Sequence, residues 1–227
     1  MIVVGLAASV FLLVTTVTCS INCIRACNEE DSSIVCNQSL ILISDVTNWM
    51  LEKNHLVFEN MKRACMGKES CDPSKVCGPE YRQSLVVHYL CVDASHIRSK
   101  SCNGNVTKMK GNSGYIQSPG YPAVTTDYTP CKWQIEPPND NVIVLSLHDI
   151  AVSSSGTSDN CDGGLIVSGR SCDGGNSVFV RRSLCGGDNL TSLVRCGKVD
   201  IELPQSQKVY PLRFWLSYHG ENNHQAS

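Results

Sequence analysis

The chain has 227 residues, which suits one or two domains with hydrophobic cores of their own. Nineteen basic and twenty-one acidic residues give a formal net charge of −2 without a basic stripe, which argues against nucleic acid or an anionic membrane surface as a partner. Fourteen cysteines are many for a cytosolic protein of this size, so we interpret them first as disulfides formed in an oxidising compartment.

Residues 1–20 are predicted to be a secretory signal peptide. Residues 2–17 are apolar or small, and Thr18, Cys19 and Ser20 follow them. No Lys or Arg precedes this apolar core, so a membrane anchor is the rival interpretation, but a span needs roughly 20 residues. We expect cleavage near Cys19 or Ser20, a secreted extracellular protein, and no membrane span after signal removal.

Three N-x-[ST] sequons agree with secretion and predict a glycoprotein. The acceptor residues are Asn37, Asn105 and Asn189.

Residues 23–93 predict a small α+β domain. The apolar run 40–43 indicates a buried strand, and the segment 85–92 is apolar on both faces, which indicates a central strand. Between them, residues 46–64 predict one or two helices that cover the sheet, with Ser44 or Asp45 as the cap. The apolar positions on one helical face are Val46, Met50, Val57 and Met61.

The cysteine spacing in this domain resembles the SUEL-type (rhamnose- or galactose-binding) lectin family. The matching features are the C-x-G-K-x-S-C unit from Cys65 to Cys71 and the V-x-Y-x-C ending at Cys91. The resemblance implies the disulfides Cys36–Cys91 and Cys65–Cys71. Cys27 and Cys77 each lack the family's usual partner, so they are expected to bridge to one another. If Cys19 is removed with the signal peptide, Cys23 is left over, and it either forms an intermolecular disulfide or stays a free thiol.

The resemblance also implies a sugar site, but few of the family's pocket residues are present. Tyr81 and, conservatively, Arg82 remain, and Glu29 could replace the missing acid. We therefore expect the rhamnose or galactose pocket to be lost, because unpaired buried polar groups cost affinity. The candidate ligand-binding residues are Tyr81, Arg82 and Glu29.

Residues 94–101 are short and polar and are interpreted as a linker. A turn with aromatic residues at both ends follows at residues 115–122, which read Tyr-Ile-Gln-Ser-Pro-Gly-Tyr-Pro. Gly114 and Gly120 can adopt positive φ, so strand and turn alternate sharply here. Residues 131–135, Cys-Lys-Trp-Gln-Ile, then begin a strand with Trp133 and Ile135 on one face.

These motifs resemble a CUB domain, which implies an antiparallel, jelly-roll-like β-sandwich over residues 102–227. The resemblance implies the disulfides Cys102–Cys131 and Cys161–Cys185, and Cys172 and Cys196 most simply pair with each other. It places strands at residues 142–147 and 165–167, a family turn at residues 149–152, and a late strand in which Leu212, Phe214 and Leu216 alternate with Trp215 on the opposite face. Residues 220–227 are polar, so we expect the last strand of the family to be absent and one sheet edge to be unpaired.

Many CUB domains bind Ca²⁺ through three acidic positions. Asp162 matches one of those positions. A second corresponds to Ala151, which is not acidic but has Asp149 two residues before it, and the third falls near Ser217 or Tyr218, which are not acidic either. Asp162 and Asp149 are therefore the candidate metal residues. We therefore do not favour calcium and expect no other cofactor.

The sequence shows no catalytic constellation, so we expect no enzyme. The segment 111–114 only faintly resembles a protease nucleophile loop, and no H-E-x-x-H is present. In all, the sequence predicts a mainly β, secreted recognition protein, a lectin-like module before a CUB module, that binds extracellular glycans or glycoproteins. Two alternatives stay open: an adhesion or scaffold protein that makes only protein contacts, and a fragment of a larger CUB-bearing receptor or protease.

Overall fold

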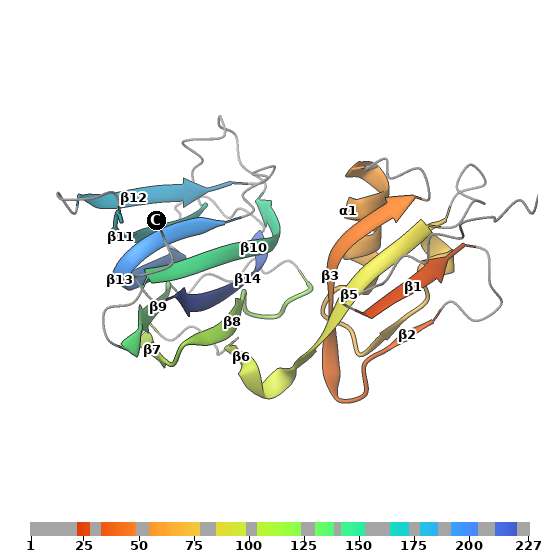
Figure 1. Cartoon of the computed structure of the whole chain (residues 1–227), viewed down its shortest axis with the longest axis horizontal. Helices are drawn as coiled ribbons and strands as arrows, with labels where there is room; N and C mark the ends of the chain where they lie inside the picture. Colours follow the sequence, from red (N-terminus) through yellow and green to blue (C-terminus); the bar gives the residue numbers. More distant parts are fainter. Residues whose placement is uncertain are drawn as a thin grey trace, which may run out of the picture.

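The computed structural model describes residues 22–27, 33–48, 55–77, 85–98, 104–123, 130–138, 142–152, 164–172, 178–185, 192–203 and 212–221. Most of these residues form β-strands, as the sequence predicts (Figure 1). The predicted signal peptide and Asn189 lie outside the described residues. Within the described ranges, no helix has the length and apolar character that crossing a bilayer requires.

The N-terminal unit, residues 22–93, contains a three-stranded antiparallel sheet in the order β1-β5-β3. β5 lies in the middle of this sheet, which confirms the prediction of a central strand there. A second, two-stranded ribbon pairs β2 with β4. The elements of the unit are β1 Asn22–Ala26, β2 Ile34–Val35, β3 Ser39–Asn48, α1 His55–Cys65, β4 Ser70–Cys71, the 3-10 helix η1 Pro73–Val76, and β5 Leu85–Asp93.

The predicted helix is correct only in its second half. Val57 and Met61 of α1 are buried in the core, as the helical spacing predicts. Val46 instead belongs to β3 and faces Val87 of β5, after a register shift between Ile43 and Asp45. The ladder to β5 continues to residue 48, so strand pairing overrides the helical pattern. Met50 lies outside the described residues.

Asp45 caps no helix. Its carboxylate accepts a hydrogen bond from the backbone N–H of Val46 at 3.0 Å, within the strand. Asp45, which was expected to cap a helix, therefore stabilises β3 at its register shift instead.

The stretch interpreted as a linker contains regular structure at residues 94–98. The 3-10 helix η3, Ala94–His96, leads into β6, Ile97–Arg98, and Asp93 accepts a hydrogen bond from the backbone N–H of Ser95 at 2.7 Å. Ile97 is buried in the N-terminal core, while β6 pairs with β8 of the next unit. This stretch therefore joins the two units directly.

The C-terminal unit is a β-sandwich, here called the sandwich, built from β6 to β14 (Figure 1). Its strands pair in the order β12-β11-β13-β10-β14-β8-β6, with β9 beside β13 and β7 beside β9. Most pairs are antiparallel, but β6–β8 and β7–β9 are parallel. Its further elements are β7 Val106–Lys110, β8 Ser113–Gln117, β9 Cys131–Glu136, β10 Val142–Val152, β11 Leu165–Arg170, β12 Phe179–Leu184, β13 Leu193–Leu203 and β14 Leu212–Glu221.

β13 connects the two layers of the sandwich. Its residues 193–196 pair with β10, residues 199–203 pair with β9, and Cys196 and residues 199–202 pair with β11. Trp133 packs edge-to-face on Phe214 with ring centroids 5.7 Å apart, so the two layers meet through aromatic side chains. Trp133 and Ile135 are both buried, which confirms their predicted common face.

Two expectations for strand ends need correction. Residues 149–152, expected as a turn, continue β10 and pair with β14 after a register shift between Leu147 and Asp149. Gly220 and Glu221, expected outside the sheet, pair with Ile143 and Val142. Both differences have one cause. The long ladder between β10 and β14 provides hydrogen-bond partners for the backbone of residues that the local sequence pattern placed in loops. Residues 222–227 lie outside the described residues.

The two glycines of the turn motif serve different purposes. Gly120 has φ +72, as predicted. Gly114 lies in β8 with no left-handed backbone, and a Cβ there would stand 2.8 Å from the ring of Tyr218. Its role is therefore the close approach of an aromatic ring rather than a left-handed turn.

Candidate functional site

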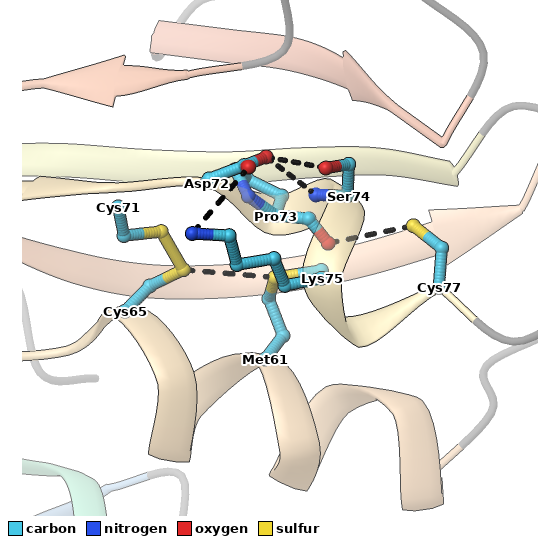
Figure 2. The surroundings of a disulfide bond; sticks show 8 residues. All are labelled: Met61, Cys65, Cys71, Asp72, Pro73, Ser74, Lys75 and Cys77. Carbon is cyan, nitrogen blue, oxygen red and sulfur yellow. Dashed lines mark hydrogen bonds and ion pairs between the residues drawn. A yellow bond between two sulfur atoms is a disulfide. The ribbon is translucent and has the colours of Figure 1, made fainter.

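The disulfides hold the N-terminal unit at three places. The structure joins Cys36 to Cys91 and Cys65 to Cys71, the pairs that the lectin resemblance implies, and it joins Cys27 to Cys77. Figure 2 shows the Cys65–Cys71 bridge at the end of α1, where Cys65 Sγ lies 3.8 Å from the Met61 sulfur.

A short turn follows that bridge. The Asp72 carboxylate accepts hydrogen bonds from the hydroxyl and the backbone N–H of Ser74 (Figure 2). The hydroxyl bond is the main cause that lowers the pKa of Asp72. The expected ligand residues Tyr81, Arg82 and Glu29 lie outside the described residues, so the structure does not place them around this turn.

In the sandwich, the expected pair Cys172–Cys196 is present. Cys131 and Cys185 are each in a disulfide, and their expected partners Cys102 and Cys161 lie outside the described residues. Among the cysteine side chains that the structure describes, none is free.

Asp149, the residue nearest to a family calcium position, lies in a buried polar cluster. Its Oδ2 accepts hydrogen bonds from the Tyr121 hydroxyl and from Arg213 Nε, each at 3.0 Å. Burial, and next the negative charge of Asp149, raise the pKa of Tyr121, so the phenol stays protonated and donates. The other carboxylate oxygen, Oδ1, is buried without a partner.

The described residues do not fit a calcium ion. Calcium takes six to eight oxygen ligands, and a guanidinium group on the carboxylate of Asp149 would repel it. Within the described residues, no three His, Cys, Asp or Glu side chains gather into a metal site. Asp162 lies outside these residues. Arg213 provides the positive charge at Asp149 in this protein.

Trp215 joins the two units. It lies on the opposite face of β14 from Phe214 and Leu216, as predicted, but it is fully buried, and it belongs to the core of the N-terminal unit. Its ring packs edge-to-face against Tyr121, with centroids 5.4 Å apart, and against Tyr115 at 6.4 Å. The aromatic residues of the CUB-like motif thus form the contact between the units.

Gly67 completes this junction from the N-terminal side. It has φ +75, and a Cβ there would stand 2.8 Å from Cε1 of Tyr121. The G of the C-x-G-K-x-S-C motif therefore gives the ring of Tyr121 access to the backbone that follows α1.

His148 lies near the same junction. Its Nε2 and the Ser217 hydroxyl are 2.8 Å apart. Burial, together with the positive charge of Lys62 on α1, lowers the pKa of His148 to about 4. The ring is therefore neutral at physiological pH.

The opposite end of the sandwich exposes a different surface. β12 pairs with β11, and it is the last strand in the order of the described sheet. Two large apolar side chains face solvent here: Val178, just before β12, at 59% exposure, and Phe179, its first residue, at 64%. Arg181 and Arg182 on the same strand are exposed, as is Arg170 opposite Phe179. We call this surface the β12 edge.

The sequence pattern predicted neither the junction around Trp215 nor the β12 edge. In the sequence, Phe179 looks like any apolar strand residue, and Arg170 lies on β11, a different strand from Arg181 and Arg182. The available signal was the run Val178-Phe179-Val180-Arg181-Arg182, in which apolar and cationic residues stand together.

One apolar cavity opens between the layers, lined by Leu145, Leu147, Val167, Leu184 and Leu193 among others. Its volume of about 10 Å³ is room for one water-sized molecule, too little for a sugar ring.

The fold and its disulfides define the class of this unit: a disulfide-bonded, mainly antiparallel β-sandwich module. The model of the CUB domain family matches residues 102–216, about half of the chain, and the chain belongs to that family. No curated protein matches the sequence.

Several solved structures are similar. The MASP-1 CUB2 domain bound to Ca²⁺ is 18% identical with a TM-score of 0.39, over 52% of this chain and 100% of that chain. The CUB1-EGF-CUB2 domain of human MASP-1/3 is 13% identical with a TM-score of 0.39, over 88% and 87%. The extracellular region of zebrafish Gpr126/Adgrg6 is 17% identical with a TM-score of 0.39, over 53% and 15%. Similarity at this level carries no information about partners.

Proposed function

We propose that the protein is a secreted, glycosylated recognition protein that binds a partner protein in the extracellular space through the β12 edge. The function is binding and not catalysis. The observation that carries the proposal is the exposure of Phe179, the first residue of the edge strand β12, and of Val178 just before it. Large exposed apolar side chains beside charged ones are typical of protein interaction surfaces, and they are costly to leave in water.

The disulfides support an extracellular setting, because such bonds persist in oxidising compartments. Two sequon residues support glycosylation, since Asn37 and Asn105 are both exposed. Neither Asn37 nor Asn105 lies on β12, so a glycan on either residue would not be attached at the β12 edge.

A second candidate function is glycan binding by the N-terminal unit, which we propose to be a SUEL-type lectin-like domain over residues 23–93. The pairs Cys36–Cys91 and Cys65–Cys71 favour it, because they are the pairs of that family. The residues that would contact sugar, Tyr81, Arg82 and Glu29, remain candidates.

Both candidates can be tested on the secreted protein. The full chain is applied to an array of extracellular protein ectodomains and to a glycan array, with and without calcium. The proposed function expects binding to one or more ectodomains that survives glycosidase treatment of the ectodomain and is lost in the Phe179→Ser variant. Binding to glycans alone, abolished by Tyr81→Ala, would instead favour the lectin function. No binding to either array would contradict the recognition function.

A further inference from the structure

One guanidinium group beside the β12 edge is buried, and no acidic side chain among the described residues forms an ion pair with it. Arg195 lies opposite Ile143 on the core-facing side of β13 and is only 8% exposed. Its Nη1 donates to the Val194 carbonyl at 2.8 Å, while its Nε is buried with no partner. A buried cation that lacks a counter-charge is costly, so an anion at this position would lower the free energy.

Gly169 makes room for the Arg195 side chain. A Cβ on Gly169 would stand 3.3 Å from Arg195 Cδ and 3.4 Å from Cγ, so the aliphatic part of Arg195 lies across β11 at this glycine. The neighbour of Gly169 on the other side is Val180 of β12. The Arg195 side chain is therefore directed from β13 toward β12.

A second arginine stands on β12 itself. Arg182 faces Val167 of β11, two residues along from the Gly169–Val180 pair and on the same face. Burial, and next the positive charge of Arg182, lower the pKa of Arg195, which agrees with the closeness of the two cations. Two like charges near each other in a partly buried place repel unless an anion lies between them.

The acidic residues of β13 do not fill this role. Asp200 accepts a hydrogen bond from Gln134 at 2.8 Å, and Glu202 accepts one from Lys132 at 2.8 Å. Both alternate with the core residues of β13, so they lie on the other face of the strand. No ion pair found among the described residues includes Arg182 or Arg195.

We propose that β12 binds an extended acidic segment of a partner protein as an added strand, with one carboxylate of that segment held between Arg182 and Arg195. This inference rests on the proposed recognition function and names the partner's chemistry. The edge of β12 supplies backbone groups for strand addition, and arginine binds carboxylates through paired hydrogen bonds. Phe179 lies on the other face of β12 from Arg182, so its exposed ring would lie against the apolar side chains that alternate with the acidic ones in the same segment.

The observations favour this occupant over two others. A second copy of the chain would bring its own Arg181 and Arg182 against these arginines, and like charges opposed across strands destabilise the pairing. A sulfated glycan would satisfy the arginines, but it would leave Val178 and Phe179 in water.

The test uses the secreted full-length chain and two blocked, fluorescently labelled peptides, Val-Glu-Val-Glu-Val-Glu-Val and the same sequence with Gln in place of Glu. Fluorescence anisotropy at low salt measures their dissociation constants. We expect the Glu peptide to bind at least about tenfold more tightly than the Gln peptide, and Arg182→Gln to remove that difference. Arg195→Lys, which keeps the charge but loses the planar fork, should weaken Glu-peptide binding by several-fold.

Arg63→Gln is the matched control, because Arg63 is exposed on α1 and its loss changes the net charge equally. Equal binding of both peptides, or equal weakening by Arg63→Gln and Arg182→Gln, would overturn the proposal. Binding of a heparin fragment at this site without binding of the Glu peptide would overturn it in favour of a sulfated glycan.

Binding of the Phe179→Ser and Arg182→Gln variants to the ectodomain array distinguishes failure of the acidic-segment proposal from failure of the recognition function. Wild-type binding that Phe179→Ser abolishes and Arg182→Gln leaves intact would overturn the acidic-segment proposal while the recognition function stands. Wild-type binding that both variants weaken supports the acidic-segment proposal. No wild-type binding at all would overturn the recognition function and this inference together.

Discussion

Gly67 and Gly104 share a left-handed backbone but differ in their surroundings. Their φ angles are +75 and +78, and a Cβ would meet the Tyr121 ring at 2.8 Å from Gly67 but nothing within 4 Å from Gly104. The cost of the backbone conformation is therefore common to both residues, and the steric cost belongs to Gly67 alone.

We expect Gly104→Ala to cost about 1 kcal/mol of unfolding free energy, from backbone strain alone. Gly67→Ala should cost about 1–3 kcal/mol more, because the new methyl group must displace the Tyr121 ring at the junction. Urea unfolding of both variants measures the difference. Equal losses in the two variants would show that the contact between Gly67 and Tyr121 contributes nothing.

His148 gives the junction a dependence on pH. Its pKa is about 4 in the folded chain and 6.5 ordinarily, so the folded state binds the proton less readily than the unfolded state. The neutral His148 ring therefore leaves the folded state unaffected above about pH 6.5. As the pH falls from 6.5 toward 4, the unfolded state binds the proton first, and the free energy of unfolding decreases by up to about 3 kcal/mol.

We expect the melting temperature of the wild type to fall over this pH range by more than that of His148→Gln, which removes the titrating ring. His96→Gln, at an exposed position in η3, is the control and should follow the wild type. Parallel melting curves for the wild type and His148→Gln between pH 7 and pH 4 would contradict this assignment.

At the scale of elements, the ladder between β10 and β14 assembles the buried polar cluster. Asp149 of β10 and Arg213 of β14 are separated by 64 residues in sequence but are 3.0 Å apart, and their side chains are 2% and 13% exposed. Removal of one partner from such a pair leaves an uncompensated buried charge, which costs more than the pair contributes.

We expect Arg213→Met to cost about 3–5 kcal/mol, because Asp149 then lies buried and unpaired. Asp149→Asn combined with Arg213→Met should be less damaging than Arg213→Met alone, since Asn still accepts from Tyr121 and carries no charge. Urea unfolding of the three chains provides the comparison. Lys132→Met, which breaks the exposed pair with Glu202, is the control and should cost less than about 1 kcal/mol. A loss in the double variant that equals or exceeds the loss in Arg213→Met would exclude charge burial as the cause.

On the scale of the whole molecule, Trp215 couples the two units, because it belongs to the sandwich by sequence and to the N-terminal core by contact. A protein whose units share a buried side chain of this size is expected to unfold as one. β6 adds to the coupling, since it pairs with β8 while Ile97 is buried in the N-terminal core.

We expect one calorimetric transition for the wild type and two for Trp215→Ala, with a loss of about 3–5 kcal/mol in the more sensitive unit. Trp133→Ala removes a tryptophan from inside the sandwich and is the control, because it should lower stability without separating the transitions. A single transition in Trp215→Ala would show that other contacts suffice to couple the units.

Local pattern was sufficient for much of the fold. Alternation placed Trp133 and Ile135 on one buried face and Trp215 opposite Phe214, and the turn motif predicted the positive φ of Gly120. The motifs also led to the CUB family, because turns, cysteine spacing and strand period are local properties that neighbouring residues determine.

The tertiary structure alone decided which faces meet. It placed Val46 in a strand, because β5 offered a ladder that outweighed a helical pattern. It brought the guanidinium group of Arg213 to Asp149, and it buried Trp215 in a second core although its face of β14 could have met water. It also buried Arg195 with no ion-pair partner among the acidic residues that the structure describes. Each outcome depends on elements distant in sequence that come together only when the chain is folded, which no local period encodes.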